Sequence, residues 1–157
     1  MTKIVQAITK QAKPDPDTLK KFSFTNEDQK MLKSLGVSTL ILFGSQAQGV
    51  AGPMSDYDIG VILEDPGKEH QGSQRTEIYD ALYDLLSGKI QELVNIDIVF
   101  LRQAPMELRS HVVQYGVPLY EEDPNIFANF RERTMLDYAD FAPHRKIFQQ
   151  ATLDRIP

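Results

Sequence analysis

Two apolar runs joined through a Gly-Ser turn constrain the fold of this chain more than any other feature. The first run spans residues 37–43 and ends at Gly44-Ser45, and the second lies within residues 55–63. Short apolar runs rich in β-branched residues and bounded by turn residues predict strands, so the stretch indicates strand, turn, helix start, loop and strand. Glycine allows a tight turn that a ligand can approach closely, and the first amides of a helix bind anions. Gly44 and Ser45 are therefore candidates for holding a phosphate.

Two aspartates, Asp56 and Asp58, open the second run with Tyr57 between them. Side chains alternate across a strand, so we expect both carboxylates on one face and Tyr57 on the other. Two unpaired like charges so close together are costly and call for a cation. Oxygen-only ligands suit Mg²⁺ or Mn²⁺, and Mg²⁺ commonly arrives with the phosphates of a substrate.

Composition narrows the class of protein. The 157 residues are enough for one domain, and 41% hydrophobic with 25% charged residues is ordinary for a globular protein. A formal net charge of −5 gives no basic footprint, so direct nucleic-acid binding is not expected. The chain has no cysteine, which excludes disulfides and a Cys nucleophile. No stretch approaches the roughly 20 apolar residues of a membrane span and no signal peptide is recognisable, so we expect a cytoplasmic protein without membrane contact.

Hydrophobic periodicity predicts helices on both sides of the two strands. Residues 1–36 form the expected N-terminal helical arm. Its first short helix contains Ile4, Val5 and Ile8, and its second starts near Asn26 and stops at Gly36. After the second strand, Ile78, Leu82, Leu85, Leu86, Ile90 and Leu93 recur at helical spacing and predict a long helix before another apolar run at residues 95–101.

The second half of the chain predicts a further helix, an edge strand and a helical tail. The helix follows Pro105 and ends at Gly116, and Pro118 restricts residues 117–120 to an edge strand at best. From about residue 123 the pattern is helical, with Pro143 expected to break the tail into two helices. The expected fold is α/β (α+β), a small mixed sheet flanked by helices. Residues 37–122 would form its core, and residues 123–157 a helical tail packed on it.

The spacing of the first motif resembles that of a known superfamily. Gly44-Ser45, ten intervening residues and Asp56-x-Asp58 resemble the nucleotidyltransferases related to DNA polymerase β, of which the minimal nucleotidyltransferases are the shorter members. The superfamily implies a third carboxylate on a later strand. Asp97 lies inside the apolar run 95–101, where an acid is hard to explain by packing alone.

The later part of the chain is similar to a narrower group. Residues 115–121, followed by a charged helix with Arg131, Tyr138 and Asp140, resemble the minimal nucleotidyltransferase (MNT) antitoxins encoded beside HEPN-domain RNase toxins. The resemblance covers roughly residues 37–155. It implies an ATP- and Mg²⁺-dependent transfer of AMP to a tyrosine hydroxyl of the toxin, and a hetero-oligomer with that toxin.

The resemblance also implies a role for each residue of the motif. Asp56, Asp58 and Asp97 would be the catalytic metal ligands for Mg²⁺ or Mn²⁺, and Asp97 would help to deprotonate the incoming hydroxyl. Gly44 and Ser45, with Asp56 and Asp58, would bind the nucleotide. No protein nucleophile is required, because positioning and electrostatics carry most of such a catalysis.

Two alternatives stand beside this hypothesis. Gln48 occupies a position where many relatives carry an arginine, so a catalytically weak antitoxin that acts by binding the toxin is the first. The second is a small-molecule nucleotidyltransferase. Such relatives generally carry an additional helical domain for the acceptor, and the roughly 55 residues after Leu101 are few for one.

Overall fold

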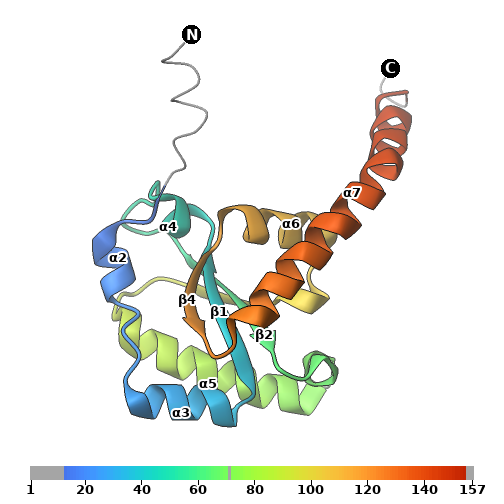
Figure 1. Cartoon of the computed structure of the whole chain (residues 1–157). Coiled ribbons are helices and arrows are strands. Elements are labelled where there is room, and N and C mark those ends of the chain that lie inside the picture. The colour runs from blue at the N-terminus through green and yellow to red at the C-terminus, as the bar shows by residue number, and fades with distance from the viewer. Residues whose placement is uncertain (1–12, 71, 155–157) are drawn as a thin grey trace.

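The computed structural model describes residues 13–70 and 72–154 of the chain (Figure 1). The predicted helix around Ile4, Val5 and Ile8 lies outside the described residues. The described part is a mixed α/β fold with one four-stranded sheet in the order β3-β2-β1-β4. The strands are β1 (Val37–Phe43), β2 (Tyr57–Leu63), β3 (Ile96–Phe100) and β4 (Val117–Glu121). The predicted fold class, a small mixed sheet flanked by helices, is confirmed.

Strand directions follow from the connections. β1 runs antiparallel to both β2 and β4, whereas β2 and β3 are parallel. Parallel neighbours need a crossover, and α5 (Gly72–Ile90) supplies it. Every residue of the central strand β1 is buried, including the polar Ser38 and Thr39.

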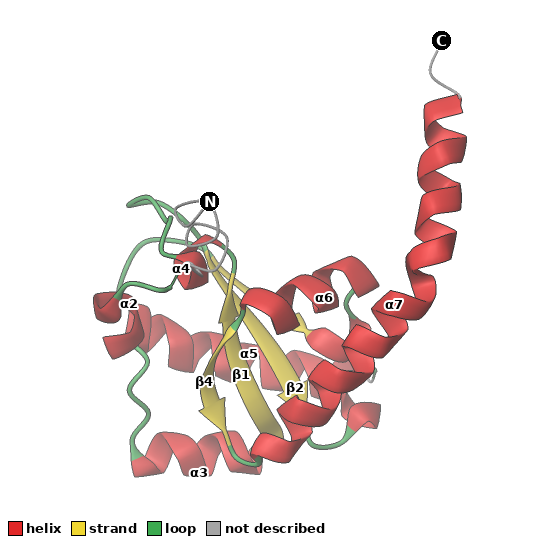
Figure 2. Cartoon of the chain, turned by 45° about the horizontal axis from the view of Figure 1, so that its top comes forward, coloured by secondary structure: helices red, strands yellow, loops and turns green. Residues whose placement is uncertain are grey.

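Helices cover both faces of the sheet (Figures 1 and 2). Alternate residues of β1 separate into two cores: Leu40 and Leu42 belong to the core under α3 (Asn26–Ser34) and α5. Ile41 and Phe43 belong to the core under α6 (Met106–Tyr115) and α7 (Pro124–Asp154). The face of α5 that packs on the sheet is the predicted one, since its buried residues are Ile78, Leu82, Leu86 and Ile90. Leu93, which was expected to continue this face, is instead 99% exposed beyond the helix end.

The N-terminal helices show how local sequence sets helix ends. α3 begins with a capping box in which Thr25 and Asp28 bond each other's backbone amides, and it ends before Gly36, whose φ is 76°. This helix lies where it was predicted. α2 (Pro16–Lys20) was not predicted, because Pro16 was expected only to stop a preceding helix. Pro16 instead occupies the first turn, where a missing N–H costs nothing.

The C-terminal half contains one correction. β4 is an edge strand, as Pro118 predicted. The tail, however, is one helix with Pro143 inside it, so the prediction of two helices was wrong. A proline in a helix removes one backbone hydrogen bond, which can bend the helix without ending it. In Figure 2, α7 changes direction along its length and its last turns stand clear of the body. Among the described residues, no helix has the length and apolar character to cross a bilayer.

Candidate active site

The sheet brings two of the predicted carboxylates side by side. Asp58 is the second residue of β2 and Asp97 the second residue of β3, and the parallel register pairs them directly. Their neighbours Tyr57 and Ile98 belong to the core under α5, so both aspartates lie on the other face, toward α6 and α7. Asp56 precedes β2 by one residue and is exposed. Asp56 was expected to open the strand, but β2 begins one residue later, at Tyr57.

The Gly-Ser turn closes over this pair. Phe43, the last residue of β1, pairs with Asp58, so Gly44 follows directly beside the carboxylate. The φ of Gly44 is 74°, and a Cβ at this position would stand 2.2 Å from Asp58 Oδ2. Only glycine therefore permits both the backbone turn and the position of Asp58. The short helix α4 (Ser45–Gln48) begins at the next residue.

The charges of the three aspartates are unbalanced. Burial, and then the negative charges of Asp97 and Asp56, raise the pKa of Asp58 to about 6. Asp97 is exposed although it lies within a strand. A divalent cation between these oxygens would offset the repulsion, and carboxylate oxygens are the donors that Mg²⁺ and Mn²⁺ prefer.

The carboxylates do not form a closed cage. Within residues 13–70 and 72–154, no three His, Cys, Asp or Glu side chains converge closely enough to enclose a metal ion by themselves. This arrangement fits a cation that completes its coordination with substrate phosphates and water, as Mg²⁺ usually does. The donor set and the raised pKa of Asp58 thus fit a metal brought with a nucleotide.

Tyr57 fixes the strand between the two aspartates. Its ring is buried to 1% exposure against Phe22, with ring centroids 6.0 Å apart, edge to face. Its hydroxyl accepts a hydrogen bond from Lys21 Nζ at 2.9 Å and donates to Glu92 Oε2 at 3.5 Å, and Lys21 forms a salt bridge with Glu92. The bond to Glu92, and then that to Tyr57, raises the pKa of Lys21. The residue after α2 and the loop after α5 therefore hold the start of β2 from behind.

Lys21 and Glu92 were missed by the sequence reasoning. They stand 71 positions apart, and no local pattern distinguishes them from other surface charges. The loop between the motif residues is held separately: Gln46 Nε2 donates to the Ser55 carbonyl at 3.4 Å, and Gly52 N donates to Ser55 Oγ at 2.8 Å.

Comparison with known protein families found a match to most of this chain. The family model described as "Polymerase beta, Nucleotidyltransferase" matches residues 26–125. A search of curated proteins found no match.

Solved structures share the fold over most of their length. A chain in the crystal structure of a toxin-antitoxin with AMP-PNP is 26% identical, with a TM-score of 0.62, covering 82% of this chain and 99% of that one. A chain from the toxin-antitoxin MntA-HepT is 22% identical, with a TM-score of 0.57 and coverage of 82% and 95%. A third comes from the tri-AMPylated Shewanella oneidensis HEPN toxin in complex with MNT antitoxin. It is 21% identical, with a TM-score of 0.58 and coverage of 87% and 98%.

Proposed function

The chain belongs to the polymerase beta nucleotidyltransferase family, and from this membership we propose that it is an antitoxin that transfers AMP from ATP to a tyrosine hydroxyl of a HEPN-domain toxin. The observation that carries the proposal is the pairing of Asp58 with Asp97 beside the Gly44 turn. It places two carboxylates, with Asp56 close by, next to backbone that can receive phosphates.

Each residue has a part in the reaction. Asp56, Asp58 and Asp97 would hold Mg²⁺, or Mn²⁺ in its place, and the cation would neutralise the triphosphate and stabilise attacking and leaving oxygens. Gly44 and Ser45 would hold the terminal phosphates against the turn. The tyrosine oxygen would attack the α-phosphorus while the bond to pyrophosphate breaks, and the phenol proton would pass to the exposed Asp97.

Known structures of similar chains support the protein acceptor. One neighbour is a toxin-antitoxin with AMP-PNP, and another complex contains a tri-AMPylated HEPN toxin with MNT antitoxin. We place the reaction in the cytoplasm, which supplies ATP and Mg²⁺.

Intact mass spectrometry tests the proposal. The HEPN toxin encoded beside this chain is incubated with the chain, ATP and Mg²⁺, and an Asp56→Asn/Asp58→Asn double variant is the control. A gain of one or more AMP units with the wild type alone is expected. A stable complex that neutralises the toxin without any gain in mass would overturn AMP transfer and leave the binding-only antitoxin.

A further inference from the structure

Three arginines from three elements line a groove between α6 and α7. Arg102 belongs to the short 3-10 helix η2 (Leu101–Gln103), Arg109 to α6 and Arg133 to α7. The groove has a volume of about 460 Å³, and Ile126, Phe130 and Asp137 also line it. The sequence alone indicated no role for these arginines.

Arg109 lacks the partner that its burial calls for. Its Nε is buried without a hydrogen bond, and among the described residues Arg109 takes part in no salt bridge. A buried guanidinium N–H is expensive to leave unpaired, so nearly all such groups in folded proteins find an acceptor. Nε itself is out of reach of solvent, but Arg109 as a whole is half-buried and lines the open groove, so an acceptor from another molecule can bind its terminal nitrogens there.

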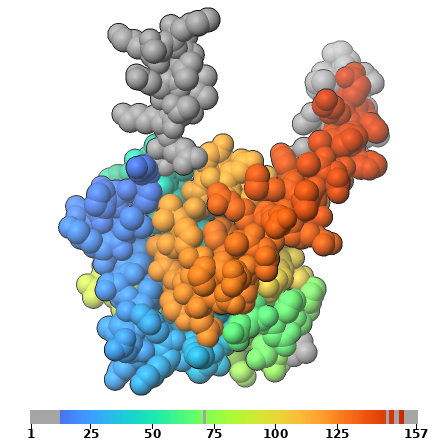
Figure 3. Space-filling view, viewed as in Figure 1, coloured from blue at the N-terminus to red at the C-terminus, as the bar shows by residue number. Residues whose placement is uncertain are grey.

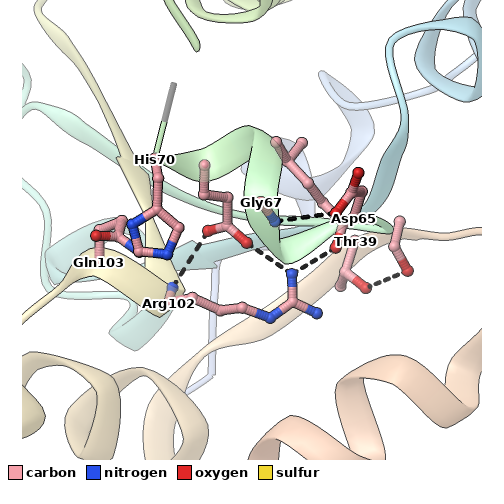
Figure 4. Close-up of polar contacts among 9 residues, drawn as sticks. Thr39, Asp65, Gly67, His70, Arg102 and Gln103 are labelled. Carbon is pink, nitrogen blue, oxygen red and sulfur yellow. Dashed lines mark hydrogen bonds and ion pairs between the residues drawn. The ribbon is translucent and has the colours of Figure 1, made fainter. Parts of the chain in front are cut away.

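Arg102 is held in place with donors to spare. Its Nη1 donates to the Leu63 carbonyl and to Glu69 Oε2, both at 2.6 Å, and its backbone N donates to Glu69 Oε1 at 3.3 Å (Figure 4). Glu69 is fully buried, so this pair fixes the guanidinium firmly. The described residues give Nε and Nη2 of Arg102 no hydrogen bond, and both remain available at the groove.

The charged side chains at the groove have a net charge of one positive. Against three guanidinium groups stand two carboxylates, Glu69 on Arg102 and Asp137, which pairs with the exposed Arg133 at 3.5 Å. Three positive minus two negative charges leave one positive charge, in a chain whose formal net charge is −5. A single carboxylate balances this excess, whereas a phosphate dianion would exceed it.

We propose that this groove receives an acidic side chain of the protein that the active site modifies. The inference rests on the proposed function and adds where the partner binds. The guanidinium group of an arginine can donate two parallel hydrogen bonds to a carboxylate. Shortening one member of such a desolvated pair usually weakens binding strongly.

A protein fits this groove better than a small molecule because apolar surface adjoins it. Met135 and Leu136 of α7 are 53% and 58% exposed and line a second groove with Phe127 and Pro124. Leu136 also lines a further groove together with Arg133. Figure 3 shows α7, in orange to red, as a ridge that crosses the body of the protein and projects beyond it. An anion-binding pocket beside exposed apolar side chains is typical of a protein interface.

The groove is separate from the reacting atoms. Arg102 bonds the carbonyl of Leu63, at the far end of β2 from Asp58, and five residues of strand span ~17 Å. Both lie on the sheet face under α6 and α7, so one partner can cover the groove and reach the aspartates. A contact this remote changes partner affinity rather than the chemical step.

Arg109→Gln tests the inference, and Arg75→Gln on α5, on the opposite side of the sheet, is the matched control. Binding of the unmodified HEPN toxin is measured by calorimetry, and AMP transfer by steady-state kinetics. For Arg109→Gln we expect Kd and KM for the toxin to rise about 10-fold or more, with kcat unchanged within about 2-fold. Arg75→Gln should change none of these. If Arg109→Gln lowers the melting temperature, the exposed Arg133→Gln replaces it.

A rescue experiment identifies the bound group. Acidic surface residues of the toxin are changed singly to lysine, and each variant is titrated against wild type and Arg109→Glu. One toxin variant should bind wild type weakly and Arg109→Glu better. Absence of any such pair, or an unchanged Kd in both Arg109→Gln and Arg133→Gln, would overturn the inference.

Two further results distinguish a carboxylate groove from a phosphate site, and docking from AMP transfer. Inorganic phosphate or ATP that binds without toxin, and loses affinity in Arg109→Gln, would make the groove a phosphate site and overturn the carboxylate assignment. Toxin binding that depends on Arg109 without AMP transfer by the wild type would defeat the proposed function and support the docking site. AMP transfer by the wild type, with toxin binding that does not depend on Arg109, would support the proposed function and overturn the docking site.

Discussion

The backbone of Gly44 lies so close to the carboxylate of Asp58 that no side chain fits on Gly44. A Cβ on Gly44 would lie 2.2 Å from Asp58 Oδ2 and 3.2 Å from its Cγ, far inside van der Waals contact. The turn that would receive phosphates and the carboxylate that would hold the cation are therefore packed directly on each other. Two separate constraints therefore require glycine at position 44. One is the contact with Asp58, and the other is the φ of 74°, which disfavours any L side chain.

Gly44→Ala should remove activity because it displaces Asp58. We expect AMP transfer to the HEPN toxin to fall about 100-fold, since small displacements of catalytic groups cost that much. The strained backbone should lower the free energy of unfolding by about 1–2 kcal/mol. Gly88→Ala on α5 is the control: nothing lies within 4 Å of its added Cβ, and activity should be unchanged. Full activity of Gly44→Ala would show that the contact does not constrain the site.

Asp58→Asn should stabilise the protein in the absence of divalent metal. An acid whose pKa is raised in the folded state destabilises that state above its unfolded pKa, and the penalty is lost as pH falls from about 6 toward 4. Because solvent screens the half-buried carboxylate, we expect a gain of about 1 kcal/mol at pH 8 and none near pH 4.

Urea unfolding in EDTA at both pH values measures this gain. Asp84→Asn on the exposed side of α5 is the control and should change stability at neither pH. Mg²⁺ should stabilise the wild type and leave Asp58→Asn nearly unaffected. An equal effect of Mg²⁺ on both proteins would argue against Asp58 as a metal ligand.

Tyr57→Phe tests whether the rear support of β2 positions the aspartates. The change removes a hydroxyl that Lys21 and Glu92 bond and should cost about 1 kcal/mol of unfolding free energy. If the support matters for geometry, kcat should also fall several-fold while KM for the toxin stays the same. Tyr83→Phe on the exposed side of α5 is the matched control. A loss of stability with unchanged kcat would show that Tyr57 stabilises the fold without positioning the aspartates.

The strands of the motif could be predicted because their signals are local. β1 has the predicted bounds, since its apolar run is bracketed by turn residues on both sides. The pairing of Asp58 with Asp97 followed from the resemblance and from the unusual position of an acid within a strand. What the sequence did not reveal is which distant charges meet, such as Glu69 and Arg102, which are 33 positions apart. Glu69 is fully buried although it stands among charged and polar residues in the sequence.

Arg102→Met should destabilise the fold because it leaves Glu69 buried without a partner. Breaking a buried ion pair from one side typically costs about 3–5 kcal/mol. Burial already raises the pKa of Glu69, and Arg102 opposes that rise, so removing Arg102 should raise this pKa further. The penalty in Arg102→Met should then lessen as pH falls, since the carboxyl becomes protonated and neutral.

The double variant Arg102→Met/Glu69→Met isolates the pair itself. It should regain most of the lost stability, because two apolar side chains leave no buried charge. Urea unfolding of both single variants and the double variant gives the coupling energy. Arg75→Met is the control for removal of an arginine that packs over Phe100 instead of a carboxylate. A double variant as unstable as Arg102→Met alone would mean that Arg102 stabilises the fold chiefly through its bond to the Leu63 carbonyl.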